Sequence, residues 1–305
     1  MRSVLILGAY DDPQALRVAQ CLRASQAAPI WCDTAAFPEK DRLSAGNSGW
    51  RLNDEPVPPV GAVYLRGFEC NPSASRYAED FESRPRGLLA QMDEKRSMLS
   101  SFVLTLEGEG AVVVNGLMAN AQHTNKPYQL ALLRRAGLPV PDWLATNDPE
   151  EVRSFVKAVG MAVYKPLSGG ATVRKVDPED LTDKRLAALQ AAPVLFQELA
   201  EGVSIRAYVV GRRVVAAAAI RSSELDYRRG EETVELIRLA PEERRAAVGA
   251  ARACGMLFTG VDLIRTAKGH KVLECNPSPM FAVFEEKTGL DVAGPLANLL
   301  LRLAR

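Results

Sequence analysis

The chain has 305 residues, 47% hydrophobic and 25% charged, which is the balance of a globular protein with a sizeable core and not of a disordered chain. Its formal net charge of +1 gives no support for a nucleic-acid partner or an anionic membrane surface. The longest apolar stretches, such as Val214 to Ile220, are too short to span a bilayer, so we expect no membrane segment.

The first third of the chain alternates short apolar strands with amphipathic helices, which is typical of an open α/β domain. The turn after the first strand reads Gly8-Ala9-Tyr10-Asp11-Asp12 and lacks the GxGxxG pattern that brings a pyrophosphate to a helix N-terminus. A nicotinamide enzyme is therefore not expected. We place this domain at 1–118, with strands at 4–7, 29–32, 62–65 and 111–115 and helices at 13–24 and 88–104.

The middle of the chain predicts a small α+β lobe at 119–193. A helix at 127–136 ends at Gly137, with Pro139 and Pro141 beyond it, and Pro149 opens a second helix to residue 159. A strand at 161–164, a glycine-containing loop and a short return strand follow. From residue 194 strands dominate, and we place a third part at 194–305, with strands at 194–199, 205–210, 214–220 and 234–239 and helices at 241–254 and 292–302.

Three oxygen-bearing side chains near the C-terminus form a candidate metal site. Asp262 interrupts the apolar run 261–264, and Glu274 and Asn276 lie in the tract Val-Leu-Glu-Cys-Asn-Pro-Ser-Pro-Met. Because strand side chains alternate, these residues fall on matching faces of neighbouring strands. Such a set suits Mg²⁺, which combines a few carboxylates with substrate phosphates. The alternative is a surface hairpin with solvated acids.

Two lysines are candidate phosphate ligands. Lys165 ends a buried strand and faces a loop with Ser168, Gly169 and Gly170, whose backbone N–H groups can approach phosphate oxygens closely. Lys126 stands just before a helix and offers a second cation. For both lysines the alternative is an ordinary solvated side chain beside a turn.

The strand around Gln197, Glu198 and Leu199 is a candidate site for a nucleotide base, since an interlobe strand offers backbone hydrogen bonds and apolar packing. Arg206 lies on the next strand and Arg221 ends the one after it, and either can clamp a phosphate or a carboxylate. Exposed strand-end arginines are the alternative. The chain has only two histidines and five cysteines without a CxxC pair, so we expect neither imidazole chemistry nor a zinc site, and reduced thiols in a cytoplasmic protein.

In order and spacing these elements resemble the RimK-like branch of the ATP-grasp ligases, from about residue 120 to the C-terminus. The residues that carry the resemblance are Asn125-Lys126, the Lys165 loop, Gln197-Glu198, Ile205-Arg206, Asp262 and Glu274-Cys275-Asn276-Pro277. The chain is also similar to the microviridin-type (graspetide) peptide ligases, at 33–38, 62–66, 137–141, 146–150 and 226–228. It departs from the RimK-like pattern at Ser204, where an aspartate is usual, and in its short glycine-rich loop.

The resemblance implies an ATP-grasp fold, of mixed α/β and α+β class, behind an N-terminal open α/β domain. It implies ATP bound by Lys126, Lys165 and the Ser168–Gly170 loop, with Gln197 to Leu199 at the base and Mg²⁺ on Asp262, Glu274 and Asn276. A substrate carboxylate would take the γ-phosphate to give an acyl phosphate, and an amine or hydroxyl would then displace the phosphate. Arg206 and Arg221 would stabilise the acyl phosphate, and Arg228 would grip the acceptor or acidic side chains.

Three functions follow from this resemblance. The first is a ligase that forms amide or ester bonds in a peptide, and the second is a ligase of amino acids or other small molecules, of the RimK or glutathione-synthetase type. The third is a non-catalytic, nucleotide-binding regulatory protein on a degenerate ATP-grasp fold. Apolar N-terminal strands and the helix at 88–104 would support a homodimer, as is common among such relatives.

Overall fold

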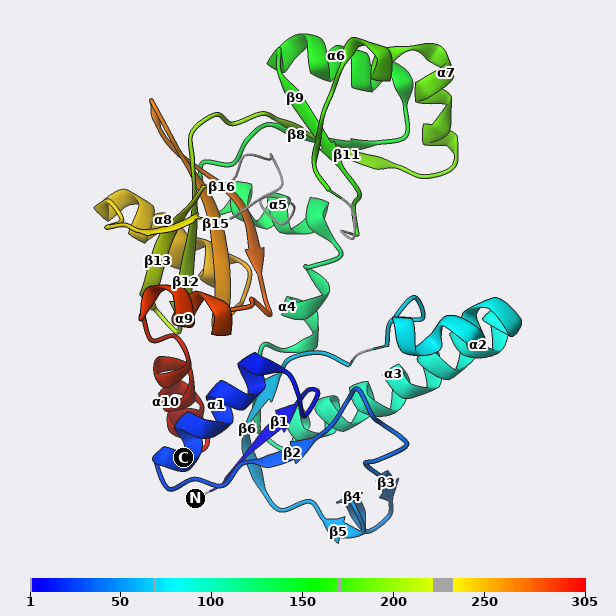
Figure 1. Ribbon diagram of the computed structural model, residues 1–305, viewed down its shortest axis with the longest axis vertical. Coiled ribbons are helices and arrows are strands. Elements are labelled where there is room, and N and C mark those ends of the chain that lie inside the picture. Colours follow the sequence, from blue (N-terminus) through cyan, green and yellow to red (C-terminus); the bar gives the residue numbers. More distant parts are fainter. Residues whose placement is uncertain (1, 69, 169–171, 222–232) are drawn as a thin grey trace. The chain divides into compact units, whose positions relative to one another are not determined.

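The computed structural model describes residues 2–68, 70–168, 172–221 and 233–305, and the chain divides into two compact units (Figure 1). One unit comprises Met1–Leu117, Met280–Ala282 and Asp291–Arg305, and the other comprises Met118–Pro279 and Val283–Leu290. Among the described residues, no helix has both the length and the apolar character needed to cross a bilayer.

The first unit is built on a parallel sheet of order β2-β1-β6-β7. Every residue of β6 is buried, as expected for a parallel strand that is covered on both faces. Helix α1 packs against α10, which also contacts β6, while α3 contacts β7. The elements are β1 (Ser3–Leu7), β2 (Ile30–Cys32), β6 (Val60–Leu65), β7 (Val112–Val114), α1 (Pro13–Ala24), α3 (Pro85–Gly108) and α10 (Ala293–Leu303).

Helix α1 shows why these segments fold as they do. Pro13 occupies its first turn, and the Oδ1 atom of Asp12 accepts a hydrogen bond of 2.7 Å from the Ala15 N–H group, so the helix start is capped. Its buried residues recur at helical spacing, which gives the helix one buried and mostly apolar face, and the helix packs against α10. The helix predicted at 13–24 is confirmed at those bounds.

A small antiparallel sheet and two short helices in this unit were not predicted. The sheet consists of β3 (Leu43–Gly46), β4 (Gly49–Leu52) and β5 (Glu55–Pro56), and the helices are η1 (Ser75–Tyr77) and α2 (Ala78–Ser83). The Trp50 ring packs on Phe102 with ring centroids 4.9 Å apart, which attaches the sheet to α3. Strands this short and this exposed carry too few apolar residues to show a periodic pattern.

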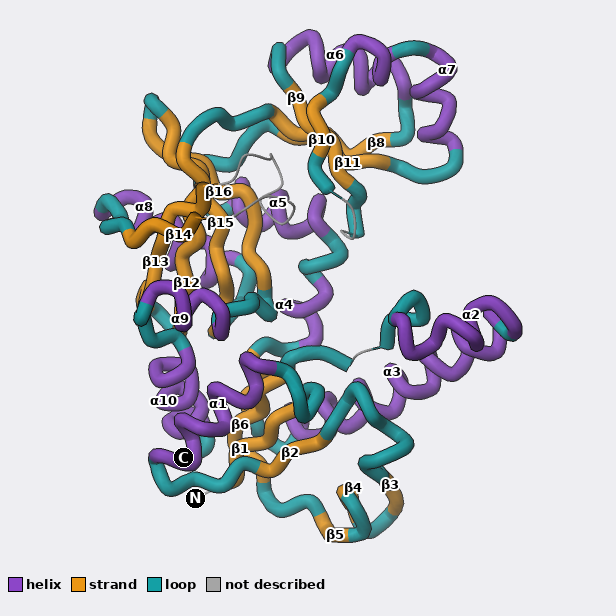
Figure 2. The backbone as a smooth tube through the Cα atoms, viewed as in Figure 1, coloured by secondary structure: helices purple, strands orange, loops and turns teal. Residues whose placement is uncertain are grey.

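The second unit contains two antiparallel sheets (Figure 2). The four-stranded sheet has the order β10-β9-β11-β8, and α6 packs on it through Val152, which lies in one apolar cluster with Phe196. Strand β8 was not predicted, whereas the helix at 149–159 is confirmed. The elements are β8 (Trp143–Thr146), β9 (Ala162–Lys165), β10 (Arg174–Lys175), β11 (Val194–Glu198), α6 (Pro149–Val159), η2 (Pro178–Leu181), α7 (Asp183–Leu186) and η3 (Ala187–Gln190).

The five-stranded sheet has the order β14-β13-β12-β15-β16, so β16 is an edge strand. Helix α8 contacts β15 and β16, and α5 contacts β16. One face of the sheet is apolar and packs on the alanines of α8. The elements are β12 (Val203–Val210), β13 (Arg213–Arg221), β14 (Thr233–Leu236), β15 (Phe258–Thr266), β16 (Gly269–Asn276), α5 (Lys126–Arg135) and α8 (Pro241–Ala253), with α4 (Leu117–Ala121) and α9 (Ala282–Thr288) outside the sheet.

A β-bulge in β16 changes the face of the sheet on which its side chains lie. Asp262 pairs with Glu274, but the next residue of β15, Leu263, pairs with Val272, so Leu273 is an extra residue. The extra residue shifts the alternation by one. Val272 therefore enters the apolar cluster with Leu263, while Glu274 lies on the opposite face beside Asp262.

Candidate active site

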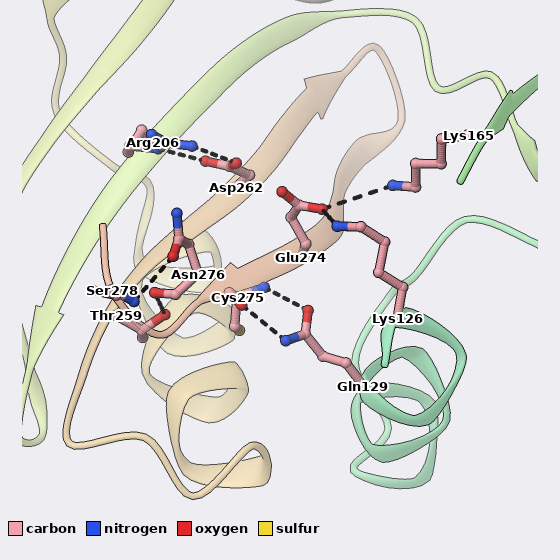
Figure 3. Close-up of polar contacts among 10 residues, drawn as sticks. All are labelled: Lys126, Gln129, Lys165, Arg206, Thr259, Asp262, Glu274, Cys275, Asn276 and Ser278. Atoms are coloured by element: carbon pink, nitrogen blue, oxygen red, sulfur yellow. Dashed lines mark hydrogen bonds and ion pairs between the residues drawn. The ribbon is translucent and has the colours of Figure 1, made fainter. Parts of the chain in front are cut away.

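A row of three charged side chains crosses the five-stranded sheet on the face opposite its apolar cluster. Arg206 on β12 lies directly opposite Asp262 on β15, which lies directly opposite Glu274 on β16. The Arg206 guanidinium donates two hydrogen bonds to Asp262, Nε to Oδ1 at 2.8 Å and Nη2 to Oδ2 at 2.7 Å (Figure 3). The row confirms the prediction that Asp262 and Glu274 share a face of neighbouring strands.

Two lysines from distant segments reach the same carboxylate. Lys126, the first residue of α5, donates from Nζ to Glu274 Oε2 at 2.7 Å, and Lys165 Nζ at the end of β9 lies 3.8 Å from that oxygen (Figure 3). Both lysine side chains are nearly buried, at 11% and 12% exposure. The fold therefore brings the two predicted phosphate-binding lysines to the predicted metal-binding carboxylate.

The electrostatic environment keeps Glu274 ionised. Burial by itself disfavours the charged carboxylate, but the positive charges of Lys165 and Lys126, with the hydrogen bond from Lys126, outweigh it and hold the pKa of Glu274 below its ordinary value. Arg206 acts in the same direction. Three cations thus face two carboxylates, an excess of positive charge that suits a polyphosphate ligand.

The residues predicted to bind metal have the donor chemistry that Mg²⁺ requires. Asp262 and Glu274 contribute carboxylates from directly paired positions, and Asn276 follows on β16 with an amide oxygen that accepts from the Ser278 N–H group at 3.0 Å. Within the described ranges no three His, Cys, Asp or Glu side chains gather into a metal-binding group. Two carboxylates and an amide fit an ion that fills its coordination sphere with water and substrate phosphates.

Gln129 belongs to the site and was missed in the sequence. Its Nε2 atom donates to the Cys275 carbonyl oxygen and its Oε1 accepts from the Cys275 N–H group, both at 2.8 Å (Figure 3). The available signal was its position in the first turn of the helix predicted at 127–136, three residues after Lys126; the structure begins the helix at Lys126, so the two residues share a helix face. The contact itself joins residues 146 apart, which no local pattern reveals.

The candidate base-binding strand contains a buried donor that lacks a protein partner. The side chain of Gln197 on β11 is buried, and its Nε2 atom has no hydrogen-bond partner among the described residues. The N–H groups of Glu198 and Leu199 donate to main-chain oxygens of Asp142 and Met161, and the Glu198 carboxylate accepts from Lys271 Nζ at 3.2 Å. The Nε2 atom of Gln197 is therefore a buried donor that can serve a ligand.

The remaining predicted site residues lie next to, or within, the segments that the structure does not describe. Ser168 is exposed in the turn after β9. Gly169, Gly170 and Arg228 lie outside the described residues. Arg221 is the last residue of β13, and its side chain is not among those described.

Comparison with known proteins identifies the class. The family model described as a RimK-like ATP-grasp domain matches residues 123–300. A probable alpha-L-glutamate ligase of Marinobacter nauticus is 36% identical over 202 residues, 62% of this chain and 67% of that protein. One of Teredinibacter turnerae is 35% identical over 219 residues, 68% and 72% of the two chains. The chain belongs to the RimK-like ATP-grasp family and is an ATP-grasp ligase.

Solved structures extend the similarity to the whole chain. The ATP-grasp ligase PsnB, complexed with a phosphomimetic variant of a minimal precursor, Mg and ADP, is 38% identical, with a TM-score of 0.90 over 100% of this chain and 99% of that one. The macrocyclase MdnC of Microcystis aeruginosa, bound with precursor peptide MdnA, is 22% identical, with a TM-score of 0.80 over 98% and 99%. The predicted ATP-grasp fold is confirmed, as is the resemblance to the graspetide-type ligases.

Proposed function

We propose that this ligase modifies a peptide, forming an amide or ester bond from a carboxylate and an amine or hydroxyl, with release of ADP and phosphate. One observation carries the proposal: the similarity to PsnB, a ligase solved with its precursor, extends over the full chain at 38% identity. The glutamate ligases match only 62% and 68% of this chain. The first unit is therefore part of the similarity to a peptide-binding enzyme.

The proposal assigns the charged row and its lysines to ATP and Mg²⁺. Lys126 and Lys165 bind phosphate oxygens, with Ser168, Gly169 and Gly170 in the adjoining loop, and Gln197, Glu198 and Leu199 hold the base. Asp262, Glu274 and Asn276 would hold Mg²⁺, which neutralises negative charge on phosphate oxygens when it is bound. The excess of positive charge at this face supports this assignment, as does the Gln197 Nε2 atom, which has no hydrogen-bond partner among the described residues.

The chemistry requires positioning and charge neutralisation instead of a proton-transfer triad. A substrate carboxylate oxygen attacks the γ-phosphorus, the bond to the β-phosphate oxygen breaks, and an acyl phosphate and ADP form. The amine or hydroxyl then attacks the acyl carbon, phosphate leaves, and the nucleophile loses its proton. Arg206 and Arg221 stabilise the acyl phosphate in this scheme, and Arg228 grips the acceptor or acidic side chains.

A second candidate is the joining of amino acids, and the identity to probable alpha-L-glutamate ligases favours it. The two candidates differ in the acceptor and not in the activation of the carboxylate. Mass spectrometry of the product therefore separates them more directly than nucleotide turnover.

The test incubates the enzyme with ATP and Mg²⁺, either with acidic peptides that contain Ser, Thr and Lys or with pooled amino acids. We expect ADP release and a peptide that has lost the mass of one water molecule for each cross-link. A gain of one amino-acid residue would identify an amino-acid ligase and contradict the cross-linking proposal. Nucleotide binding without turnover on either set of acceptors would favour the non-catalytic alternative. An Asp262→Asn variant is the control for contaminating ATPase activity.

A further inference from the structure

At Cys275 the outer edge of β16 is completed by a side chain, whereas at Val272 the N–H group donates to the Pro139 carbonyl oxygen. Among the described residues, β16 is the last strand of the five-stranded sheet and has a strand partner on one side only. At Cys275 the outward N–H and C=O groups are both satisfied by Gln129, whose amide accepts from one and donates to the other at 2.8 Å. A glutamine amide carries one acceptor oxygen and an N–H donor, so it can replace both groups of a missing neighbouring strand.

This contact is buried. Gln129 is 3% exposed and Cys275 is 2% exposed, so water does not replace the two hydrogen bonds readily if they are lost. A buried peptide group without partners is costly, and the surrounding backbone moves to find new ones. The backbone at Cys275 is therefore held by Gln129.

The position of Cys275 makes this contact significant for the site, because it lies between Glu274 and Asn276. Helix α5 contacts this stretch twice within one turn, through Lys126 on the Glu274 carboxylate and through Gln129 on the Cys275 backbone (Figure 3). Residues three apart lie on one helix face, so both contacts come from the same side of the strand.

We propose that Gln129 is a positioning residue for the metal and nucleotide site: it fixes the backbone between Glu274 and Asn276 and thereby the spacing of their oxygen ligands. The inference rests on the proposed function of that site and deepens it. Gln129 touches neither the nucleotide nor the metal in this account, and it acts only through the strand. Partners that orient metal ligands typically change metal affinity about 10- to 100-fold when they are removed.

The chain supplies a matched control. Gln122 is another buried glutamine, 5% exposed, whose Nε2 donates to the Cys254 carbonyl oxygen at 2.8 Å. Cys254 follows α8 and lies in the apolar cluster that also contains Cys275, on the face of the sheet opposite the charged row. Replacement by methionine preserves side-chain volume and removes two buried hydrogen bonds at Gln129 and one at Gln122, so both variants should lose stability. Only the Gln129 variant should lose metal affinity.

The experiment titrates Mn²⁺, as a paramagnetic probe for the metal site, into protein with ADP and measures free Mn²⁺ by electron paramagnetic resonance. We expect Gln129→Met to raise the dissociation constant about 10- to 100-fold. For Gln122→Met we expect a change within about twofold, although its midpoint of thermal unfolding should also fall. If Gln129→Met does not fold, Gln129→Asn, which is one methylene too short to reach both Cys275 groups, takes its place.

The possible results distinguish failure of the positioning role of Gln129 from failure of the proposed function. If wild type binds Mn²⁺ with ADP and a folded Gln129 variant binds it equally well, the positioning role is overturned and the proposed function stands. An equal loss of affinity in Gln122→Met would also overturn the positioning role, since general destabilisation would then explain the effect. If wild-type protein binds no Mn²⁺ with ADP, the proposed function itself fails.

Discussion

The two faces of the five-stranded sheet use the same strands for different purposes. Leu263 and Asp262 are neighbours on β15, yet Leu263 is 1% exposed in the apolar cluster under α8, and Asp262 is ion-paired with Arg206 on the other face. Val272 and Glu274 on β16 are divided in the same way, with the bulge between them. Alternation along a strand thus separates residues that stabilise the fold from residues that carry charge.

The difference in side-chain chemistry shows which face of the sheet stabilises the fold by packing. Burial of aliphatic groups stabilises a fold by about 25 cal/mol per Å² of apolar area, without a compensating desolvation penalty. Paired charges gain little, because removing them from water offsets their attraction. A row of three charges contacted by two lysines is therefore poorly explained as a stabilising device. Substitutions on the two faces should accordingly affect different quantities.

The largest effect is expected on the charged face. Glu274→Ala removes the group that both lysines contact, and we expect ADP formation to fall by about 1000-fold or more, in line with the loss of a preorganised electrostatic contact. Circular dichroism should show an intact fold, and the exposed Glu286→Ala is the control. Undiminished turnover by a well-folded Glu274→Ala variant would contradict the metal assignment.

Substitutions on the apolar face should lower the stability of the fold. Leu263→Ala leaves a cavity beside α8, and we expect the free energy of unfolding to fall by about 2–5 kcal/mol. The turnover number of the folded fraction should stay close to that of wild type. Urea denaturation and ADP release at a permissive temperature measure the two quantities. A large loss of turnover in Leu263→Ala at unchanged stability would contradict the assignment of stability to one face and turnover to the other.

A third substitution sharpens the roles of the lysines. Lys126→Met removes the cation at the start of α5, and we expect the catalytic efficiency for ATP to fall about 100-fold, mainly through weaker phosphate binding and charge stabilisation. Lys175→Met on the exposed strand β10 is the matched control and should leave the kinetics unchanged. Steady-state kinetics with varied ATP provide the measurement, and equal effects of the two substitutions would contradict the assignment.

The smallest effect concerns a buried acid on the packing side of the sheet. Glu243 of α8 accepts hydrogen bonds from Arg265 and from the Ala240 N–H group, and the bond from Arg265 is the main cause that lowers the pKa of Glu243. Because the folded pKa lies below the unfolded value of about 4.3, its contribution is complete above that pH and is lost as the pH falls through the folded pKa.

The free-energy difference between wild type and Glu243→Gln should therefore be largest near neutral pH and should shrink below about pH 4.3. Urea denaturation over that range measures it. The exposed Glu242→Gln, on the same turn of α8, should show little difference at any pH. A Glu243→Gln difference that is constant through the acidic range would contradict the role of the ion pair.

The charged row was predictable from the sequence in part. That Asp262 and Glu274 share one face follows from period-two alternation on two short apolar strands. The bulge at Leu273 does not, because an extra residue leaves no local mark in an apolar run. The contacts of Lys165 and Gln129 with β16 join segments more than a hundred residues apart, and no local propensity encodes them. The resemblance placed Lys165 in the site, but nothing placed Gln129 there.

The fold, too, was predicted where local sequence patterns decide the structure and missed where contacts between distant segments decide it. Helices with a proline at the start and an apolar stripe, such as 13–24 and 149–159, were predicted at their observed bounds. Strand β8 was missed, because its four residues are mostly half-buried and stand between prolines. Its place in the sheet comes from pairing with β11, which is a tertiary interaction.

The proposed function requires Asp262 and its neighbours on the charged face to hold a metal-bound nucleotide. Isothermal titration of ADP, with and without Mg²⁺, into wild type and Asp262→Asn tests it most directly. We expect Mg²⁺ to strengthen ADP binding to wild type by at least about tenfold and to have little effect on the variant. An equal strengthening in both proteins would contradict it, because the metal would then be bound elsewhere.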